Sequence, residues 1–196
     1  HVVAYDLSGM GDSEARESYP DKVRAQEVVD VARGTGLFEH DAKPIVIAHS
    51  YGGHVGLSAM ERHGELFDGL IICDLMVLRV ERLKAHFSNG KPMRSDRSRP
   101  NRVYPDYASA RARFVLSPPQ PVTVEYLNEY MAYHSLKQVE GGWTWKFDIS
   151  VFDSDFGVSD RILKQAQAIV AAPGRKAIVY GQDSKLFDDD SADYLR

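Results

Sequence analysis

The sequence predicts an α/β fold with a mostly parallel sheet and an inserted, mainly helical cap. Short apolar strands alternate with helical segments in residues 1–75 and again in residues 159–196, as in a parallel sheet covered by helices. Residues 76–158 break this alternation and indicate an insertion. A serine, Ser50, stands between an apolar strand and a helix, which places a hydroxyl at the carboxyl edge of the predicted sheet.

The first elements can be assigned from apolar spacing and from turn residues. Residues 2–6, VVAYD, predict a strand, and a loop with two glycines follows it. Asp21 can cap the next helix, and Gly34 and Gly36 end it. The apolar residues of that helix recur at helical spacing: Ala25, Val28, Val29 and Ala32. The loop residues with a structural role are Asp6, Gly9, Gly11, Asp12 and Ser13, whose side chains or glycine backbones favour a tight loop.

The segment around Ser50 predicts a tight strand-to-helix turn. Residues 45–47 are a continuous β-branched run, typical of a strand buried on both faces, and residues 54–63 have helical composition. A serine in such a turn has a strained backbone, which exposes its hydroxyl above the sheet. The strand and the helix of such a turn approach closely, so the residues two before and two after the serine must be small. Ala48 and Gly52 meet this requirement. By itself, the motif also fits an ordinary turn or a phosphate-binding loop.

Two further strands and a helix complete the predicted core. Residues 70–74, LIICD, form a buried strand that ends on a carboxylate, Asp74, and residues 176–180 form the last strand. Ser159 caps a helix whose apolar residues share one face: Ile162, Leu163, Ala166, Ile169 and Val170. These residues extend the alternation of strand and helix through the second part of the core, residues 159–196.

The insertion, residues 76–158, is expected to lie over the carboxyl ends of the strands as a cap. A basic, proline-containing run opens it, and a short helix is predicted near residues 107–114. A second helix begins at Thr123, and Gly141-Gly142 marks a turn before an alternating aromatic strand. Two roles are open for the aromatic residues of these elements, an aromatic wall of the substrate site or, as is more common at this spacing, the cap's own core: Tyr126, Tyr130, Tyr133, Trp143 and Trp145.

Composition excludes several classes of partner. The chain has 196 residues, 43% of them hydrophobic, which suits one domain with an insertion. A net charge of −4 argues against nucleic acid, and no apolar run approaches the roughly 20 residues of a membrane span. We therefore expect a small-molecule substrate, without cofactor or metal. A single cysteine, Cys73, permits a reducing compartment, so a cytoplasmic location is expected. The sequence allows a homodimer.

These residues together resemble the α/β-hydrolase superfamily, in the group of capped serine hydrolases. The resemblance covers nearly the whole chain and rests on the order of its motifs: YDLSGMGDS, AHSYGG, DLMV, GGWTWKFD and YGQDS. The usual elbow pattern is G-x-S-x-G, and Ala48 replaces its first glycine. By this resemblance the strands correspond to the fourth to seventh strands of the family fold. The chain is then an internal portion, and a missing third strand would lie between residues 2–6 and the elbow strand.

The resemblance also implies roles for individual residues. Ser50 would be the nucleophile, and the backbone N–H of Tyr51 one donor of the oxyanion hole. The acid is Asp74 or, as the alternative, Asp183; Ser184 occupies the usual acid position, three residues after Gly181. We prefer Asp74 because some relatives present the acid from that strand. The catalytic histidine and the second oxyanion donor would lie outside this chain.

The predicted function is hydrolysis of a carboxylic ester through an acyl-enzyme on Ser50. A serine hydroxyl becomes a good nucleophile only when an oriented base removes its proton, which is why the acid matters. His49 and Trp143 are candidate substrate-binding residues. Two alternatives stay open: a receptor-like protein with slow or absent turnover, and a carbon–carbon bond hydrolase or acyltransferase.

Overall fold

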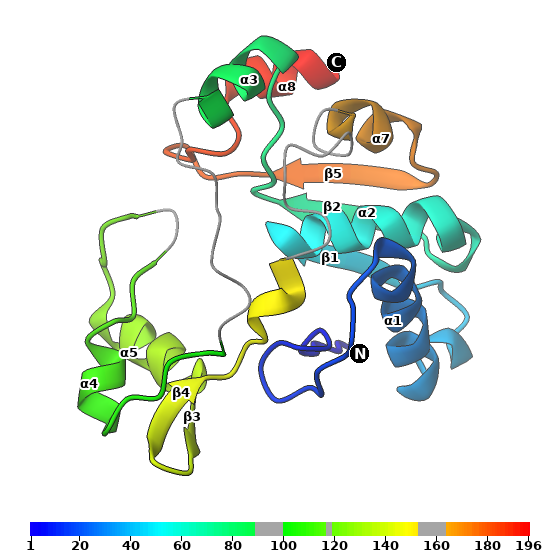
Figure 1. The fold of residues 1–196 in the computed structure, drawn as a ribbon. Coiled ribbons are helices and arrows are strands. Elements are labelled where there is room, and N and C mark those ends of the chain that lie inside the picture. Colours follow the sequence, from blue (N-terminus) through cyan, green and yellow to red (C-terminus); the bar gives the residue numbers. More distant parts are fainter. Residues whose placement is uncertain (89–99, 117–118, 153–163) are drawn as a thin grey trace. The chain divides into compact units, whose positions relative to one another are not determined.

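The computed structural model describes residues 1–88, 100–116, 119–152 and 164–196 (Figure 1). It contains two compact units, which we call the sheet unit (residues 1–5, 20–94 and 155–196) and the hairpin unit (residues 6–19 and 95–154). The predicted division placed residues 1–75 and 159–196 in the core and residues 76–158 in the cap. The observed units differ from this division, because residues 76–94 belong to the sheet unit and residues 6–19 to the hairpin unit.

The sheet unit contains a three-stranded parallel sheet in the order β1-β2-β5. Its strands are β1 (Ile45–His49), β2 (Gly69–Cys73) and β5 (Arg175–Val179), each predicted from its apolar run. The predicted strand at residues 2–6 is wrong, because the structure assigns no strand there. An extended segment becomes a strand only by pairing its backbone groups with a neighbour, and none of β1, β2 and β5 pairs with it.

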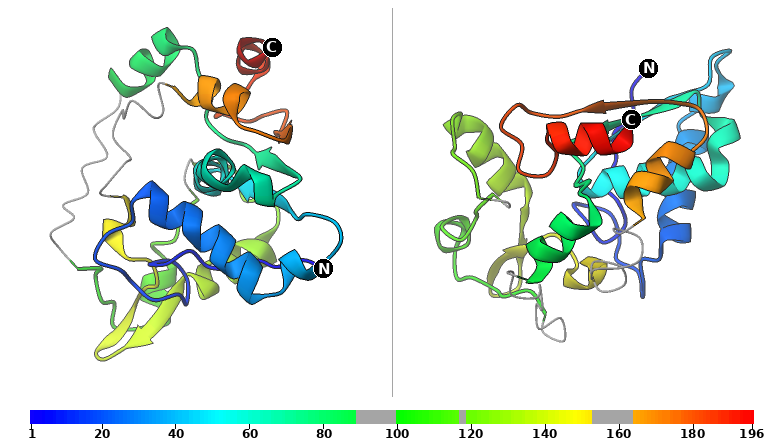
Figure 2. Two further views of the ribbon diagram at one scale, coloured as in Figure 1. Left: turned by 90° about the vertical axis from the view of Figure 1, so that its right-hand side faces the viewer. Right: turned by 90° about the horizontal axis from the view of Figure 1, so that it is seen from above.

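Helices cover one face of this sheet (Figure 2). They are α1 (Asp21–Gly34), α2 (Tyr51–His63), α7 (Gln165–Ala171) and α8 (Asp189–Leu195). Leu70 and Ile72 of β2 are buried under them, in a core that also includes Val29, Leu57 and Ile169. The alternation of side chains along a strand leaves every second residue on the opposite face.

The elbow strand is therefore not buried on both faces, as its β-branched run predicted. Ile45 is 49% exposed and Ile47 is 69% exposed, and Val179 on β5 is 55% exposed on the same face. The physical reason is that the described helices pack on the other face only, against Val46 and Ala48. A continuous apolar run is compatible with burial of both faces of a strand, but it does not determine which elements pack on each face.

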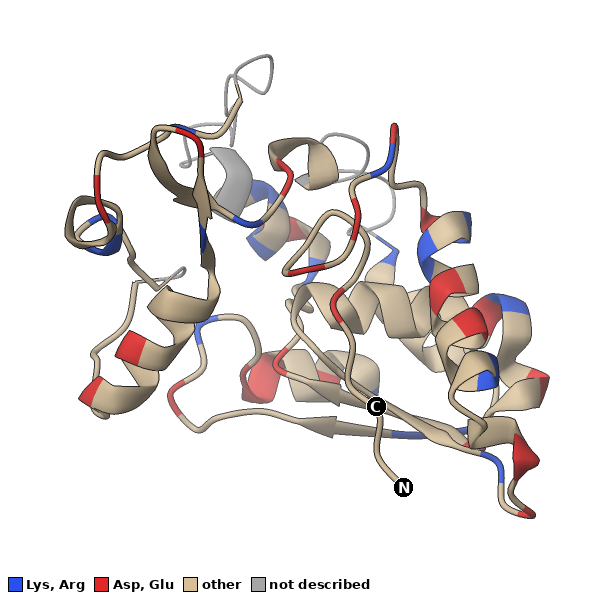
Figure 3. Ribbon diagram, turned by 90° about the horizontal axis from the view of Figure 1, so that it is seen from below, with Lys and Arg blue, Asp and Glu red and all other residues tan. Residues whose placement is uncertain are grey.

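The sheet-unit helices begin and end close to the predicted residues. The N-terminal cap of α1 is Pro20 rather than Asp21, which lies in the first turn, where a carboxylate favours the helix dipole. The outer side of α1 carries charges of both signs (Figure 3). Of the helix predicted from Ser159, the described part is α7; Ser159, Ile162 and Leu163 lie outside the described residues. Further elements are α3 (Val80–Ser88), η1 (Leu37–Glu39) and η2 (Gly64–Leu66).

The hairpin unit contains an antiparallel pair, β3 (Leu136–Val139) and β4 (Gly142–Trp145). The predicted glycine turn joins them, and Gly141 and Gly142 have φ values of 83° and 143°. The helices of this unit are α4 (Tyr107–Arg111), α5 (Glu125–His134) and η3 (Ile149–Phe152). Both α4 and α5 were predicted from the sequence, with ends that differ by a few residues. The basic run of the insertion falls largely in residues 89–99, outside the described residues.

The core of the hairpin unit is not formed by the tyrosines of α5. Tyr126, Tyr130 and Tyr133 are 74%, 61% and 55% exposed, so the prediction that they are core residues is wrong. Helix α5 instead buries Ala132. The buried cluster contains Tyr104, Ala110 and Leu136, with Trp143 and Trp145 packed against it. Tyrosines at this spacing share a helix face, but the residue that this helix buries is the small Ala132.

Loop 6–19 is fixed within the hairpin unit by several hydrogen bonds. The Tyr19 hydroxyl donates to Asp148 Oδ2 at 2.6 Å, and the Asp148 N–H donates to the Gly9 carbonyl at 2.7 Å. Inside the loop, the Asp12 N–H donates to Asp6 Oδ2 at 2.9 Å. Burial would raise the pKa of the Asp148 carboxyl, but the donors on Tyr19 and Ser150 outweigh burial and lower that pKa. These contacts give the loop the structural role that its sequence predicted.

Candidate active site

Ser50 forms the turn between β1 and α2, with φ of 49° and ψ of −117°. A residue with a side chain rarely adopts this conformation, and such strain is concentrated at functional sites. Two backbone hydrogen bonds hold the turn. The Ser50 N–H donates to the Cys73 carbonyl at 3.0 Å, and the Ser50 carbonyl accepts from the Gly53 N–H at 2.8 Å. The strained turn predicted from the sequence is therefore present.

Asp74 has a matching position at the end of the adjacent strand. Its φ is 51°, and among the described residues only Ser50 and Asp74 combine a side chain with a positive φ. Parallel pairing aligns His49 with Cys73, so the next residue on each strand, Ser50 and Asp74, extends the sheet at the same level. Neighbouring strands lie about 4.8 Å apart. The fold thus brings a hydroxyl and a carboxylate together at the carboxyl edge of the sheet.

The carboxylate of Asp74 has a specific hydrogen-bond donor. Ser184, in the segment between β5 and α8, donates its hydroxyl proton to Asp74 Oδ1. The Asp74 N–H donates to the Val179 carbonyl at 2.9 Å, which fixes the backbone at the same point. Asp183, the neighbour of Ser184, is exposed. Of the two carboxylates considered from the sequence, Asp74 is the one at the level of Ser50.

Helix α2 packs tightly on the strands that carry Ser50 and Asp74. A Cβ atom added to Gly56 would lie 3.0 Å from Leu70 and 3.1 Å from the Ala48 Cβ, closer than ordinary contact. A Cβ atom at Gly53 would lie 3.2 Å from Leu75, the residue after Asp74. By contrast, a Cβ atom at Gly52 would lie 4.0 Å from Ala48, which is an ordinary contact distance. The close approach that the sequence predicted at Gly52 therefore occurs at Gly53 and Gly56 instead.

A profile of the alpha/beta hydrolase family matches residues 1–194. The chain belongs to the alpha/beta hydrolase family. A comparison with curated proteins gave no match. This membership and the parallel sheet with its strained serine turn confirm the α/β-hydrolase fold that the sequence predicted, whereas the cap stays a prediction.

Solved structures with the same fold include three proteins of about 19% identity. A thioesterase domain from the curacin biosynthetic pathway is 19% identical with a TM-score of 0.65, covering 97% of this chain and 68% of that one. E-2-(acetamidomethylene)succinate hydrolase is 19% identical with a TM-score of 0.67, covering 96% and 66%. An esterase from Mycobacterium tuberculosis is 19% identical with a TM-score of 0.63, covering 95% and 59%. The chain thus spans roughly two thirds or less of these structures' length, and the likeness shows the fold.

In this hydrolase fold, the start of α2 supplies the groups next to the serine. Tyr51 is the first residue of the 13-residue helix, so its backbone N–H lies at the positive end of the helix dipole. The Tyr51 ring is half-buried, with the Arg24 guanidinium carbon 6.0 Å from its centroid. Arg24 is buried and forms an ion pair with Glu27 at 3.1 Å. One turn after Ser50, burial lowers the pKa of the His54 imidazole to about 4, which makes this ring neutral at pH 7.

The two predicted substrate-binding residues have different surroundings. His49 is exposed at the end of β1 and alternates with Ala48, so it belongs to the sheet face that the helices leave uncovered. Trp143 belongs to the hairpin unit, where its ring contacts Tyr107 edge to face at 5.3 Å between centroids. Its backbone pairs with Tyr104. A substrate-binding role for either residue stays a prediction.

Sequence reasoning missed the part played by Ser184. In the sequence, this serine is only a departure from the family pattern, at the usual acid position three residues after Gly181. The available signal was the combination of this serine with a carboxylate, Asp74, directly after the strand predicted at residues 70–74. Within the described ranges, no cluster of His, Cys, Asp and Glu is arranged to hold a metal ion. None of the described helices has the length and apolar character that a membrane span needs.

Proposed function

We propose that this chain is the part of a serine hydrolase that carries the nucleophile, and that it acts on carboxylic esters through an acyl-enzyme on Ser50. The observation that carries the proposal is the placement of Ser50 and Asp74. Both residues are strained, both end adjacent strands of the sheet, and they lie at the same level. Strain at two reactive side chains on one edge is typical of a site that the surrounding fold holds in position for chemistry.

In the proposed reaction, Ser50 Oγ attacks the ester carbonyl carbon while a base takes its proton. The negative charge that develops on the carbonyl oxygen is stabilised by the Tyr51 N–H at the start of α2. The alcohol leaves with a proton returned by the base, and water then releases the acid from Ser50. Asp74 orients the base and stabilises its charged form. We assign the base to a histidine outside this chain, as the family resemblance implies.

Several features support an ester or a related acyl compound as the substrate. Solved structures of the same fold include a thioesterase domain and an esterase, although their identity to this chain is only 19%. Serine is one of the residues that form acyl intermediates, and the turn at Ser50 resembles a nucleophile elbow in its positive φ between strand and helix. We further propose that the hairpin unit acts as the cap and that Trp143 contacts substrate. A cytoplasmic location and a homodimer stay predictions from the sequence.

The test uses the full-length protein and a serine-directed phosphonate probe, followed by peptide mass mapping. Labelling of the peptide that contains Ser50 is expected in the wild type and not in Ser50→Ala. Absence of labelling on correctly folded protein would contradict the proposal and favour the receptor-like alternative. Tight binding of a ligand that the wild type does not turn over, unchanged in Ser50→Ala, would also favour that alternative.

A second comparison identifies the acid. Asp74→Asn should lower kcat for an ester by orders of magnitude, because the base loses its orienting charge. Asp183→Asn should have a far smaller effect, since Asp183 is exposed and lies beside the residue that contacts Asp74. Asparagine is the appropriate substitute because it tolerates the positive φ of Asp74. The reverse ranking of the two variants would assign the acid to Asp183.

A further inference from the structure

We infer that Ser184 is a positioning residue that orients the Asp74 carboxylate for the hydrolytic reaction. The inference rests on the proposed function and extends it to a residue in the segment after β5. Ser184 occupies the position at which the family resemblance places the acid itself, while the carboxylate comes from the end of β2. The site would therefore draw its acid from one strand and the group that holds this acid from the next strand.

The direction of the Ser184 hydrogen bond follows from the other contacts of its hydroxyl. The Leu186 N–H donates to Ser184 Oγ at 3.0 Å, and the Phe187 N–H donates to it at 3.2 Å. A hydroxyl oxygen has two lone pairs and one proton. With both lone pairs accepting from backbone donors, the proton is directed to Asp74 Oδ1. Ser184 is thus fixed as a donor to the carboxylate, rather than free to rotate.

The segment that carries Ser184 is itself anchored. Phe187 is only 3% exposed and packs in the core of the sheet unit, and the Leu186 carbonyl accepts from the Val77 N–H at 3.3 Å. Asp188 caps α8 by accepting from the Ser191 N–H at 3.0 Å. A serine held on both sides in this way can hold a carboxylate in one orientation.

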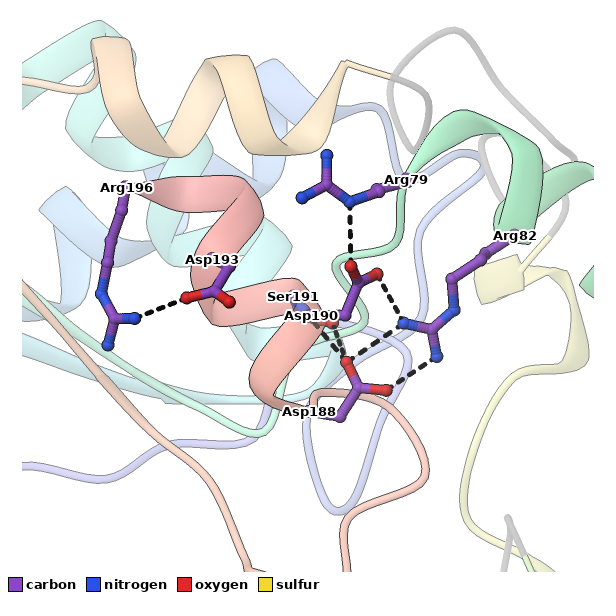
Figure 4. Close-up of polar contacts among 7 residues, drawn as sticks. All are labelled: Arg79, Arg82, Asp188, Asp190, Ser191, Asp193 and Arg196. Carbon is purple, nitrogen blue, oxygen red and sulfur yellow. Dashed lines mark hydrogen bonds and ion pairs between the residues drawn. The ribbon is translucent and has the colours of Figure 1, made fainter.

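Ion pairs between α3 and α8 add to this anchoring (Figure 4). Arg82 binds Asp188 at 2.7 Å and Asp190 at 2.8 Å, and Arg79 binds Asp190 at 3.0 Å. Hydrogen bonds from Arg82 and from the Ser191 backbone lower the pKa of the Asp188 carboxyl, so the pair stays charged well into the acidic range. The segment that follows β2 is therefore bound to the segment that follows β5 at two places. One is the hydrogen bond from the Asp74 N–H to the Val179 carbonyl, before Ser184, and the other is the ion pair of Arg82 with Asp188, after it.

This geometry assigns different tasks to the two oxygens of Asp74. Oδ1 accepts from Ser184, which fixes the plane of the carboxylate. We assign Oδ2 as the acceptor for the N–H of the base. Loss of the Ser184 hydroxyl would leave the carboxylate charged but free to rotate, so the base would be misoriented. Misplacement of this kind lowers kcat about 10- to 100-fold and changes KM little, because ground-state binding of substrate is not affected.

The test measures kcat and KM of the full-length protein on p-nitrophenyl butyrate. Ser184→Ala should lower kcat about 10- to 100-fold with KM within about twofold of the wild type. Ser184→Thr keeps the hydroxyl and should recover most of the loss. The matched control is Ser191→Ala, which also removes a serine hydroxyl bound to an aspartate, in this case Asp188 at 2.9 Å. Its kcat should stay within about twofold of the wild type.

A double-mutant cycle separates positioning from a general loss of structure. If Ser184 acts through Asp74, then Ser184→Ala should lower kcat no further in an Asp74→Asn background. An undiminished loss in that background, or wild-type kcat for Ser184→Ala, would overturn the inference while the proposed function stands. A wild type that neither hydrolyses the ester nor reacts with the phosphonate probe would overturn the proposed function and this inference together.

Discussion

Replacing Ser50 by glycine should stabilise the protein relative to replacing it by alanine. Both substitutions remove the same hydroxyl, so their difference isolates the backbone. Alanine keeps a Cβ at φ of 49° and ψ of −117°, whereas glycine adopts such values without steric conflict. The strain that glycine relieves is about 1–3 kcal/mol. Glycine also costs about 0.5–1 kcal/mol through the greater freedom of the unfolded chain.

The net expectation is that the free energy of unfolding of Ser50→Gly is about 1 kcal/mol higher than that of Ser50→Ala, since the two ranges leave a difference of about 0–2.5 kcal/mol. Urea unfolding of the two full-length variants, followed by far-UV circular dichroism, measures this difference. Ser58 provides the matched control, because it lies in the interior of α2 and is only 1% exposed. The Ser58→Gly variant should be less stable than Ser58→Ala by about 1 kcal/mol, which is the usual cost of glycine relative to alanine inside a helix.

The two serine positions should therefore give differences of opposite sign. If Ser50→Gly is less stable than Ser50→Ala, as expected at Ser58, then the turn stores no strain. The elbow would in that case be an ordinary connection between strand and helix, and the main structural support for the nucleophile would be lost. Activity does not enter this measurement, so the result is independent of the identity of the substrate.

Two further predictions concern a buried histidine and the hairpin turn. Burial lowers the pKa of His54 to about 4 in the folded protein. As the pH falls, the unfolded chain therefore takes up a proton on this imidazole before the folded protein does. The free energy of unfolding is highest above pH 6.5 and decreases as the pH falls toward 4. In His54→Gln, the decrease in the free energy of unfolding between pH 7 and pH 5 should be smaller than in the wild type by about 1–2 kcal/mol, as measured by urea unfolding. The same decrease in both proteins would contradict the burial argument. In Gly142→Ala, the new Cβ would lie 1.9 Å from the Tyr104 carbonyl oxygen, and the hairpin unit should lose about 3 kcal/mol or more, seen by fluorescence of Trp143 and Trp145. Gly141→Ala is its control, because the space around that Cβ is open within 4 Å and only the conformational cost of about 1–2 kcal/mol applies. Equal losses in the two glycine variants would show that the steric conflict is not decisive.

The backbone elements could be predicted because their signals are local. The β-branched run before Ser50, the glycines after it and the carboxylate after the next strand are all contained in short segments. Parallel pairing then requires that strand ends share one edge, so the proximity of Ser50 and Asp74 follows from two local assignments and one topological rule. Most of the candidate site was therefore predictable once the strands had been assigned.

The wrong predictions concern surroundings that the local sequence does not determine. Ile45 and Ile47 have the composition of a strand buried on both faces, but burial depends on which helices pack on each face. The same holds for Tyr126, Tyr130 and Tyr133, since a helix with apolar residues on several sides can turn any of them away from a core. Ser184 was missed because a loop serine has no distinctive pattern, and its role depends on a fold that brings it to Asp74.

The strained residues Ser50 and Asp74 are held by one set of packing contacts. Helix α2 begins directly after Ser50, and its Gly53 approaches Leu75, the residue directly after Asp74. The Ser50 N–H also donates to the carbonyl of Cys73, the residue directly before Asp74. A change in the φ of Ser50 would shift α2, and these contacts would transmit the shift to the residues on both sides of Asp74. The close packing permitted by glycine thus couples the position of the hydroxyl to that of the carboxylate.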